Sequence, residues 1–149
     1  MKKADYIINP IKMCGLVKEV AQDFVKVHLH GRLGVITVPR KMVLEDIPLD
    51  PGHELQFYFS YIQVNEIPYD YDCSTIVYDR ILEPCLVGGT LTEVNDTAAK
   101  AEIMNKLGTV AVPRRWIFTD LPLKTGQNVE FYFSPMHVVG KREIPVESI

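Results

Sequence analysis

Apolar and polar residues alternate with a period of two along several short stretches of the chain, the pattern of half-buried strands. Phe24–His30 shows this alternation clearly, and Val35–Val38 and Thr109–Val112 are rich in β-branched residues. Residues 98–104 are less distinctive, because their alanines and lysine suit a helix equally well. Strands are therefore expected to dominate, with the element at 98–104 left open by its local pattern.

The chain contains an internal repeat that decides this ambiguity. Moving the sequence by 74 positions aligns 5–64 with 79–138 without a gap, and 21 of the 60 aligned residues are identical. The stretch Leu33–Lys41 recurs as Leu107–Arg115, and the two copies of the repeat are most similar there. Such a match predicts one fold for both halves, so residues 98–104 are expected to form a strand.

The repeat divides the chain into four parts. Residues 1–64 form the first β repeat and 79–139 the second, with a connector at 65–78 and a C-terminal tail at 140–149. We predict a mainly β fold of two tandem homologous small β-barrel-type units, each with about four strands and one short helix before the last strand. The sequence leaves open whether the halves close two barrels or one pseudo-twofold barrel.

Proline marks the expected helix in each half. Pro39 and Pro113 each end a β-branched run, and proline favours the first position of a helix. Short helices are therefore predicted within 40–46 and 114–120. Long aromatic strands are expected to follow at Glu54–Val64 and Asn128–Val139.

The order of these features resembles a known family. Gly31-Arg32, a strand ending at Val38-Pro39, a short helix, a turn at Gly52 and the alternating Leu55–Phe59 resemble the AbrB/MazE swapped-hairpin pattern. The similarity covers about 31–64 and 105–138. It implies interlocked hairpins, as in the dimers that such proteins form, and DNA binding through loop arginines.

Composition narrows the possible functions. With 47% hydrophobic and 23% charged residues the chain is globular, and its net charge of -3 disfavours avid sequence-independent nucleic-acid binding. It has no apolar run near the ~20 residues of a membrane span, and no signal-like apolar region follows its N-terminal lysines. The odd count of three cysteines, without a Cys-x-x-Cys motif, indicates reduced thiols. A cytoplasmic protein without a membrane partner is expected.

Basic residues give the main candidate for a binding site. Each proline is followed by a basic pair, in a helical first turn that disfavours cations. A second basic position lies in the preceding turn of each half. An anion, an acidic partner or nucleic acid would explain them, whereas solvated side chains or ion pairs with Asp46 and Asp120 are the alternative. The candidate anion- or partner-binding residues are Arg40, Lys41, Arg114, Arg115, Arg32 and Lys106.

Other chemistry is less well marked. His28 and His30 lie on one strand face and begin a possible metal site, but a third ligand is missing and a polar strand face is favoured. No nucleophile elbow, zinc-protease helix or phosphate-binding glycine loop occurs, and Gly88-Gly89 precedes a strand and not a helix. We predict no enzyme activity, no metal and no cofactor. The acidic, aromatic part of the connector, residues 68–73, is expected to be a solvated loop or a partner-binding segment.

The sequence thus favours a non-enzymatic cytosolic interaction protein of small-barrel type. A homodimer is expected, because the long aromatic strands of such small units should have an edge that needs covering. One alternative is an AbrB-like DNA-binding transcriptional regulator. Another is a small-ligand binding protein with its site between the repeats.

Overall fold

The computed structural model describes residues 8–67 and 70–141 of the chain. Within these ranges eleven strands form one sheet, which confirms the mainly β prediction. The strands are β1 (Ile11–Val20), β2 (Phe24–Leu29), β3 (Val35–Pro39), β4 (His53–Phe59), β5 (Ile62–Val64), β6 (Cys85–Val94), β7 (Ala98–Ile103), β8 (Gly108–Pro113), β9 (Ile117–Phe118), β10 (Asn128–Phe133) and β11 (His137–Lys141). The short helical turns are η1 (Arg40–Met42), η2 (Thr75–Asp79) and η4 (Arg114–Trp116), whereas η3 (Met104–Lys106) is a tight turn with left-handed residues. The N-terminal lysines and most of the predicted tail lie outside the described residues.

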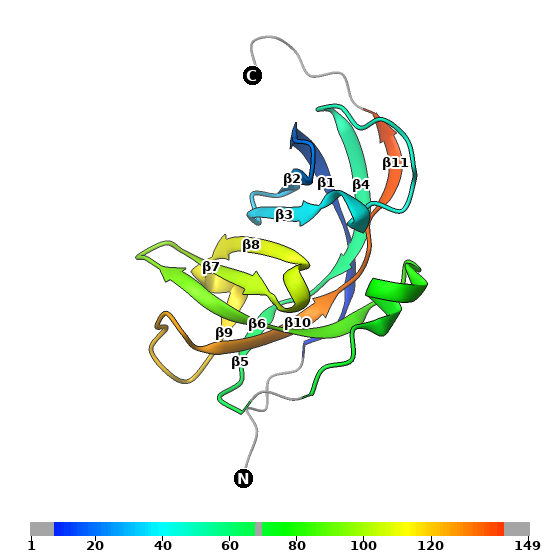
Figure 1. The fold of residues 1–149 in the computed structure, drawn as a ribbon. Helices are drawn as coiled ribbons and strands as arrows, with labels where there is room; N and C mark the ends of the chain where they lie inside the picture. The colour runs from blue at the N-terminus through cyan, green and yellow to red at the C-terminus, as the bar shows by residue number, and fades with distance from the viewer. Residues whose placement is uncertain (1–7, 68–69, 142–149) are drawn as a thin grey trace.

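Eight of the strands form a closed ring. They follow one another in the order β4-β1-β2-β3-β8-β7-β6-β10, and a pairing of β4 with β10 joins the ends (Figure 1). The described strands of both halves therefore share one sheet, and the halves do not close two separate barrels. The homology of the two units and their boundaries stay predictions from the sequence.

The two junctions between the halves fall on repeat-equivalent residues. β3 pairs antiparallel with β8, with Ile36 opposite Val110, and β4 pairs with β10 through Phe59 opposite Phe133. In each pair the partners lie 74 positions apart in the sequence. Each half thus meets the other through the same segments, as expected for a pseudo-twofold arrangement around the ring.

A glycine in the repeated motif permits the β3–β8 junction. Gly34 and Gly108 have φ values of +120° and +127°, which L-residues rarely adopt. A Cβ atom at Gly34 would lie 1.9 Å from the carbonyl oxygen of Ala111, and one at Gly108 would lie 2.2 Å from that of Thr37. The Leu-Gly part of the motif therefore has a structural role, namely to let the two halves approach.

The long aromatic strands predicted at Glu54–Val64 and Asn128–Val139 are each broken, which corrects that prediction. The breaks follow Phe59 and Phe133, and the chain then crosses to the other half. β5 pairs with β10, and β11 pairs with β4. Within the described part of the chain, β4 and β10 thus have neighbours on both sides, so the open edges that motivated the homodimer are absent from them.

The helices predicted within 40–46 and 114–120 are only three residues long, as η1 and η4. The chain returns to extended structure at once, because the following residues pair with the opposite half. Val43 forms a parallel bridge with Met136, and Ile117 pairs in parallel with Ile62. Inter-half pairing thus replaces the second helical turn.

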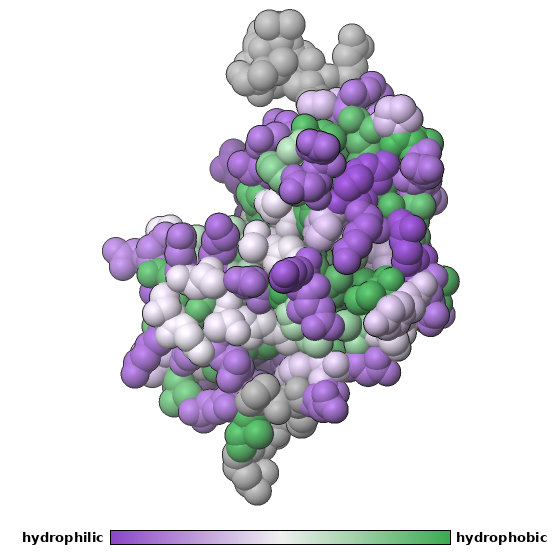
Figure 2. Space-filling view, viewed as in Figure 1, coloured by the Kyte–Doolittle hydropathy of each residue, from purple (hydrophilic) through white to green (hydrophobic). Residues whose placement is uncertain are grey.

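The aromatic residues of β4 and β10 form the centre of the core. Phe57, Phe59, Phe131 and Phe133 are fully buried, and the ring centroids of Phe59 and Phe131 lie 5.6 Å apart. Figure 2 shows mostly hydrophilic residues on one face, with apolar residues in separate patches. The phenylalanines of the two predicted aromatic strands thus belong to one hydrophobic core.

Candidate functional site

The basic pairs that follow β3 and β8 do not converge. Because these strands are antiparallel about Ile36 and Val110, η1 and η4 start at opposite ends of the pair. Four residues on each side of the junction separate the pairs by roughly 26 Å along the strands, at ~3.3 Å per residue. Arg40–Lys41 and Arg114–Arg115 therefore form no common patch.

The first arginine of each pair binds backbone carbonyls. The guanidinium of Arg40 donates to the carbonyl oxygens of Glu45 at 3.2 Å and Ile47 at 2.6 Å. The guanidinium of Arg114 donates to the carbonyl oxygen of Asn95 at 3.0 Å. Both arginines thus fasten nearby loops, while Lys41 and Arg115 are exposed.

Arg32 and Lys106 occupy the tight turns after β2 and β7. Both are exposed and adopt left-handed conformations, with φ values of +58° and +57°. The residues before them, Gly31 and Asn105, are also left-handed, with φ values of +77° and +56°. Positive φ at both central positions is the geometry of a type I′ hairpin turn. Each turn borders a groove on the sheet.

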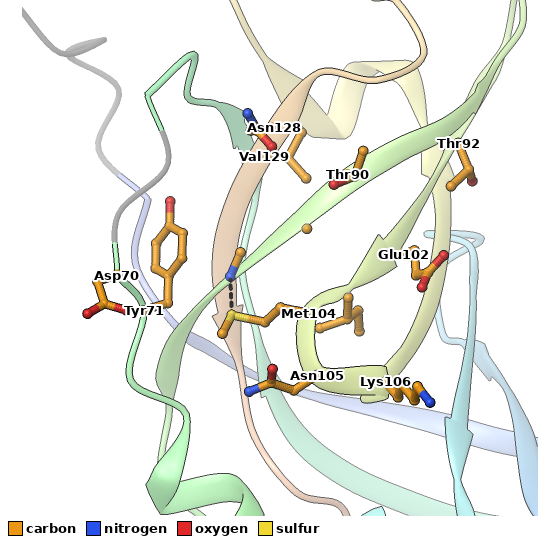
Figure 3. A pocket seen from close by; sticks show the side chains of 13 residues that line it. Asp70, Tyr71, Thr90, Thr92, Glu102, Met104, Asn105, Lys106, Asn128 and Val129 are labelled. Atoms are coloured by element: carbon orange, nitrogen blue, oxygen red, sulfur yellow. Dashed lines mark hydrogen bonds between the residues drawn. The ribbon is translucent and has the colours of Figure 1, made fainter.

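The two grooves occupy repeat-equivalent places. The first, which we call the basic groove, has a volume of about 480 Å³, and the second, the connector groove, has a volume of about 770 Å³. The basic groove is lined by Leu16, Lys18, His28, Leu29, His30, Gly31, Arg32, Gly34 and Val35. The connector groove is lined by Asp70, Tyr71, Gly88, Gly89, Thr90, Thr92, Glu102, Ile103, Met104, Asn105, Lys106, Asn128 and Val129 (Figure 3).

The connector explains why the second groove is larger. Asp70 and Tyr71 lie along one side of it, and the ring of Tyr71 stands on the side of β6 and β10 (Figure 3). The ring of Tyr71 lies against Gly88, where an added Cβ atom would be only 2.6 Å from the ring carbon Cε2. The first half has Cys14 in place of Gly88, and the described residues that line the basic groove include no tyrosine, phenylalanine or tryptophan. Tyr71 and Gly88 together thus build a wall that has no equivalent in the described lining of the basic groove.

Sulfur contacts hold this wall to the sheet. The Cys85 thiol donates to the carbonyl oxygen of Asp72 at 3.0 Å, and the side-chain amide of Asn105 donates to Cys73 Sγ at 2.7 Å. On the groove floor, the backbone N–H of Gly88 donates to Met104 Sδ at 3.2 Å (Figure 3). Burial, followed by the nearby Cys73 and Asp72, raises the pKa of the Cys85 thiol and keeps it protonated near neutral pH. These hydrogen bonds connect the wall to β6 and η3.

Most of the connector groove was not predicted from the sequence. Of its lining residues the sequence predicts only Lys106 as a binding residue. It predicts a solvated loop or a partner-binding segment at 68–73, and Gly88-Gly89 only as residues that precede a strand. The available signal was the replacement of Cys14-Gly15 by Gly88-Gly89, which leaves room for a ring. The sequence does not indicate which ring fills this space, because Tyr71 lies in the connector, outside the two aligned segments.

Among residues 8–67 and 70–141, no three His, Cys, Asp or Glu side chains lie close enough to hold a metal ion. His28 and His30 instead line the basic groove. No described helix is long and apolar enough to cross a membrane.

Comparison with known proteins gives similarity to solved structures but no family. The chain matches no protein-family model and no curated protein. Among solved structures it is similar to the cytoplasmic molybdate-binding protein ModG with molybdate bound, with 17% sequence identity and a TM-score of 0.28. That match covers 89% of this chain and 96% of ModG.

Proposed function

We propose that this chain is a non-catalytic small-ligand binding protein whose site is the connector groove. The observation that carries the proposal is the connector wall, in which Tyr71 packs on Gly88 and enlarges one of two equivalent grooves. A volume of about 770 Å³ is in the range of ligand sites, ~300–1,000 Å³. The hydrogen-bonded wall reduces the entropy that a ligand must overcome on binding.

The lining indicates the kind of ligand. Thr90, Thr92 and Asn128 offer neutral hydrogen-bonding groups, while Tyr71 and Met104 offer apolar surface. Carboxylates at Asp70 and Glu102 accompany the ammonium group of Lys106, so both signs of charge are present. This mixture suits a polar, neutral or zwitterionic small molecule with an apolar portion that packs against Tyr71.

A thermal-shift screen of polar metabolites against wild type and two variants tests this proposal. Thr90→Tyr fills the connector groove, and Leu16→Tyr makes the same change at the repeat-equivalent position in the basic groove. A ligand at about 100 times its Kd stabilises the folded state by ~2.7 kcal/mol. We expect compounds that raise the Tm of wild type and Leu16→Tyr but not of Thr90→Tyr. Compounds that stabilise all three proteins equally, or none at all, would contradict the proposal.

Self-association and DNA binding stay predictions. For DNA, the described geometry separates Arg40–Lys41 from Arg114–Arg115, so a duplex would have to contact the two pairs at distant places. For the homodimer, β4 and β10 are covered on both sides, and β11 and β9 are the outermost described strands. Neither function has a specific observation in its favour comparable with the wall of the connector groove.

A further inference from the structure

The basic groove differs from its repeat equivalent in charge. Its ionisable lining residues are Lys18, His28, His30 and Arg32, and none of the described residues lining it is acidic. The equivalent positions in the connector groove hold Thr92, Glu102, Met104 and Lys106, so only the last is basic. The ionisable lining residues are thus all basic in one groove, whereas those at the equivalent positions of the other are one acidic and one basic residue.

Arg32 occupies its turn position despite an unfavourable backbone conformation. Its φ of +58° is one that glycine adopts freely and that an L side chain adopts at a conformational disadvantage. Glycine is the common residue at this position of a type I′ turn, so the turn itself does not require arginine. Such a residue points to a role for its side chain, and here the side chain borders the basic groove.

We propose that the basic groove binds a small dianionic oxyanion, such as inorganic phosphate or a phosphate monoester, between Lys18, His28, His30 and Arg32. Arginine and lysine donate charge-assisted hydrogen bonds to such oxygens, and a protonated imidazole adds a further donor. This site lies in the other half from the connector groove and does not depend on the function proposed for that groove.

The surrounding charges predict how binding changes with pH. Burial lowers the pKa of His28, and the nearby charges of Lys18 and Lys26 lower it further. A bound dianion offsets this repulsion, so protonation of His28 and anion binding strengthen each other. Affinity is therefore expected to rise as the pH falls through the histidine range.

Other charged groups around His28 lie on β1 and β4. Glu19 on β1 is the cross-strand neighbour of Lys26 on β2. Glu54 on β4 is the cross-strand neighbour of Leu16 on β1, and Leu16 in turn lies opposite His28. β3, the other strand that pairs with β2, has no ionisable side chain between Val35 and Pro39. The basic residues therefore outnumber the carboxylates around the groove.

Titration of the full chain with inorganic phosphate at constant ionic strength, followed by amide NMR, tests this site. Arg32→Gly removes the guanidinium while it suits the turn, and Lys106→Gly makes the same change in the other half. We expect Arg32→Gly to lose phosphate affinity by ~10-fold or more, with an unchanged or higher Tm. Lys106→Gly and Thr90→Tyr should bind phosphate as wild type does.

Sulfate supplies the pH series, since it keeps its charge while histidine titrates between about pH 5 and 8. The wild type should bind sulfate more tightly as the pH falls, and His28→Glu, which copies residue 102, should not bind it. A titration that does not saturate, or equal affinities of Arg32→Gly and Lys106→Gly, would overturn the proposal. Duplex DNA that displaces sulfate from the same residues would also overturn it, in favour of a nucleic-acid surface.

Discussion

The junction of β4 and β10 depends on two buried serines. Ser60 and Ser134 are fully buried, and each accepts a hydrogen bond from a backbone N–H of the opposite half. Tyr132 N donates to Ser60 Oγ and Tyr58 N donates to Ser134 Oγ, both at 2.8 Å. Ser60 in turn donates to the carbonyl oxygen of Tyr61 at 2.8 Å. The hydroxyls thus replace the backbone pairing that ends at this junction.

Replacing Ser60 by alanine should destabilise the fold measurably. The change leaves the N–H of Tyr132 without its acceptor in a buried place, and an unsatisfied buried group costs about 1–3 kcal/mol. Only one oxygen atom is removed, so a cavity contributes little. For a chain of this size we expect the Tm to fall by roughly 2–12 °C. Ser134→Ala should have a similar effect, because its contacts are repeat-equivalent.

Urea unfolding followed by tryptophan fluorescence measures this effect. Trp116 is the one tryptophan of the chain, and its indole N–H donates to the carbonyl oxygen of Ser60 at 2.8 Å. It also stacks on Phe59 at 6.1 Å, so it reports on the junction. The control is Thr125→Ala at an exposed turn, expected to change stability by less than ~0.5 kcal/mol. If both serine variants match this control, the hydroxyls do not hold the junction.

Three further predictions concern other parts of the ring. Desolvation raises the pKa of Glu45, but hydrogen bonds from Val138 N and His137 outweigh it and hold the pKa below 4.5. The free energy of unfolding of the wild type should therefore fall by up to ~1 kcal/mol relative to that of Glu45→Gln as the pH falls from about 4.5 through the lowered pKa. Urea unfolding at a series of pH values measures this difference. Gly34→Ala should abolish cooperative unfolding in calorimetry, because the Cβ atom meets a carbonyl at 1.9 Å; a wild-type transition would contradict this. For the expected homodimer, light scattering should give twice the monomer mass, and a monomer at high concentration would exclude it.

The strands of the ring were largely readable from the sequence. Periodicity located β2 and β3, and the repeat identified β7 correctly where the local composition of Ala98–Ile103 was ambiguous. Both halves were predicted to share one fold, and the β1–β2 pairing of the first half has the same register as the β6–β7 pairing of the second, with Gly15 opposite Leu29 and Gly89 opposite Ile103. Local patterns suffice for β2 and β3, because one face of each of these strands is buried.

What the sequence missed depends on contacts between the halves. Ser60 looked like part of a continuous strand, but β4 ends before it and its hydroxyl accepts a hydrogen bond from the N–H group of Tyr132 in the other half. Ile117 looked helical, but its pairing with Ile62 favours extended structure. The connector groove was missed for a different reason, since Tyr71 lies in the connector, outside the repeat, and the alignment of the halves cannot show its contact with Gly88. Periodicity carries no information on such long-range contacts.

The most direct test of the central claim is amide NMR mapping of a compound that stabilises the protein in the thermal-shift screen. If the connector groove is the site, the largest shifts should fall on Tyr71, Gly88, Thr90 and Asn105, and Thr90→Tyr should abolish them. The corresponding positions in the basic groove should stay unchanged. Shifts confined to other surfaces, or shifts that persist in Thr90→Tyr, would contradict the claim that the connector builds a ligand site.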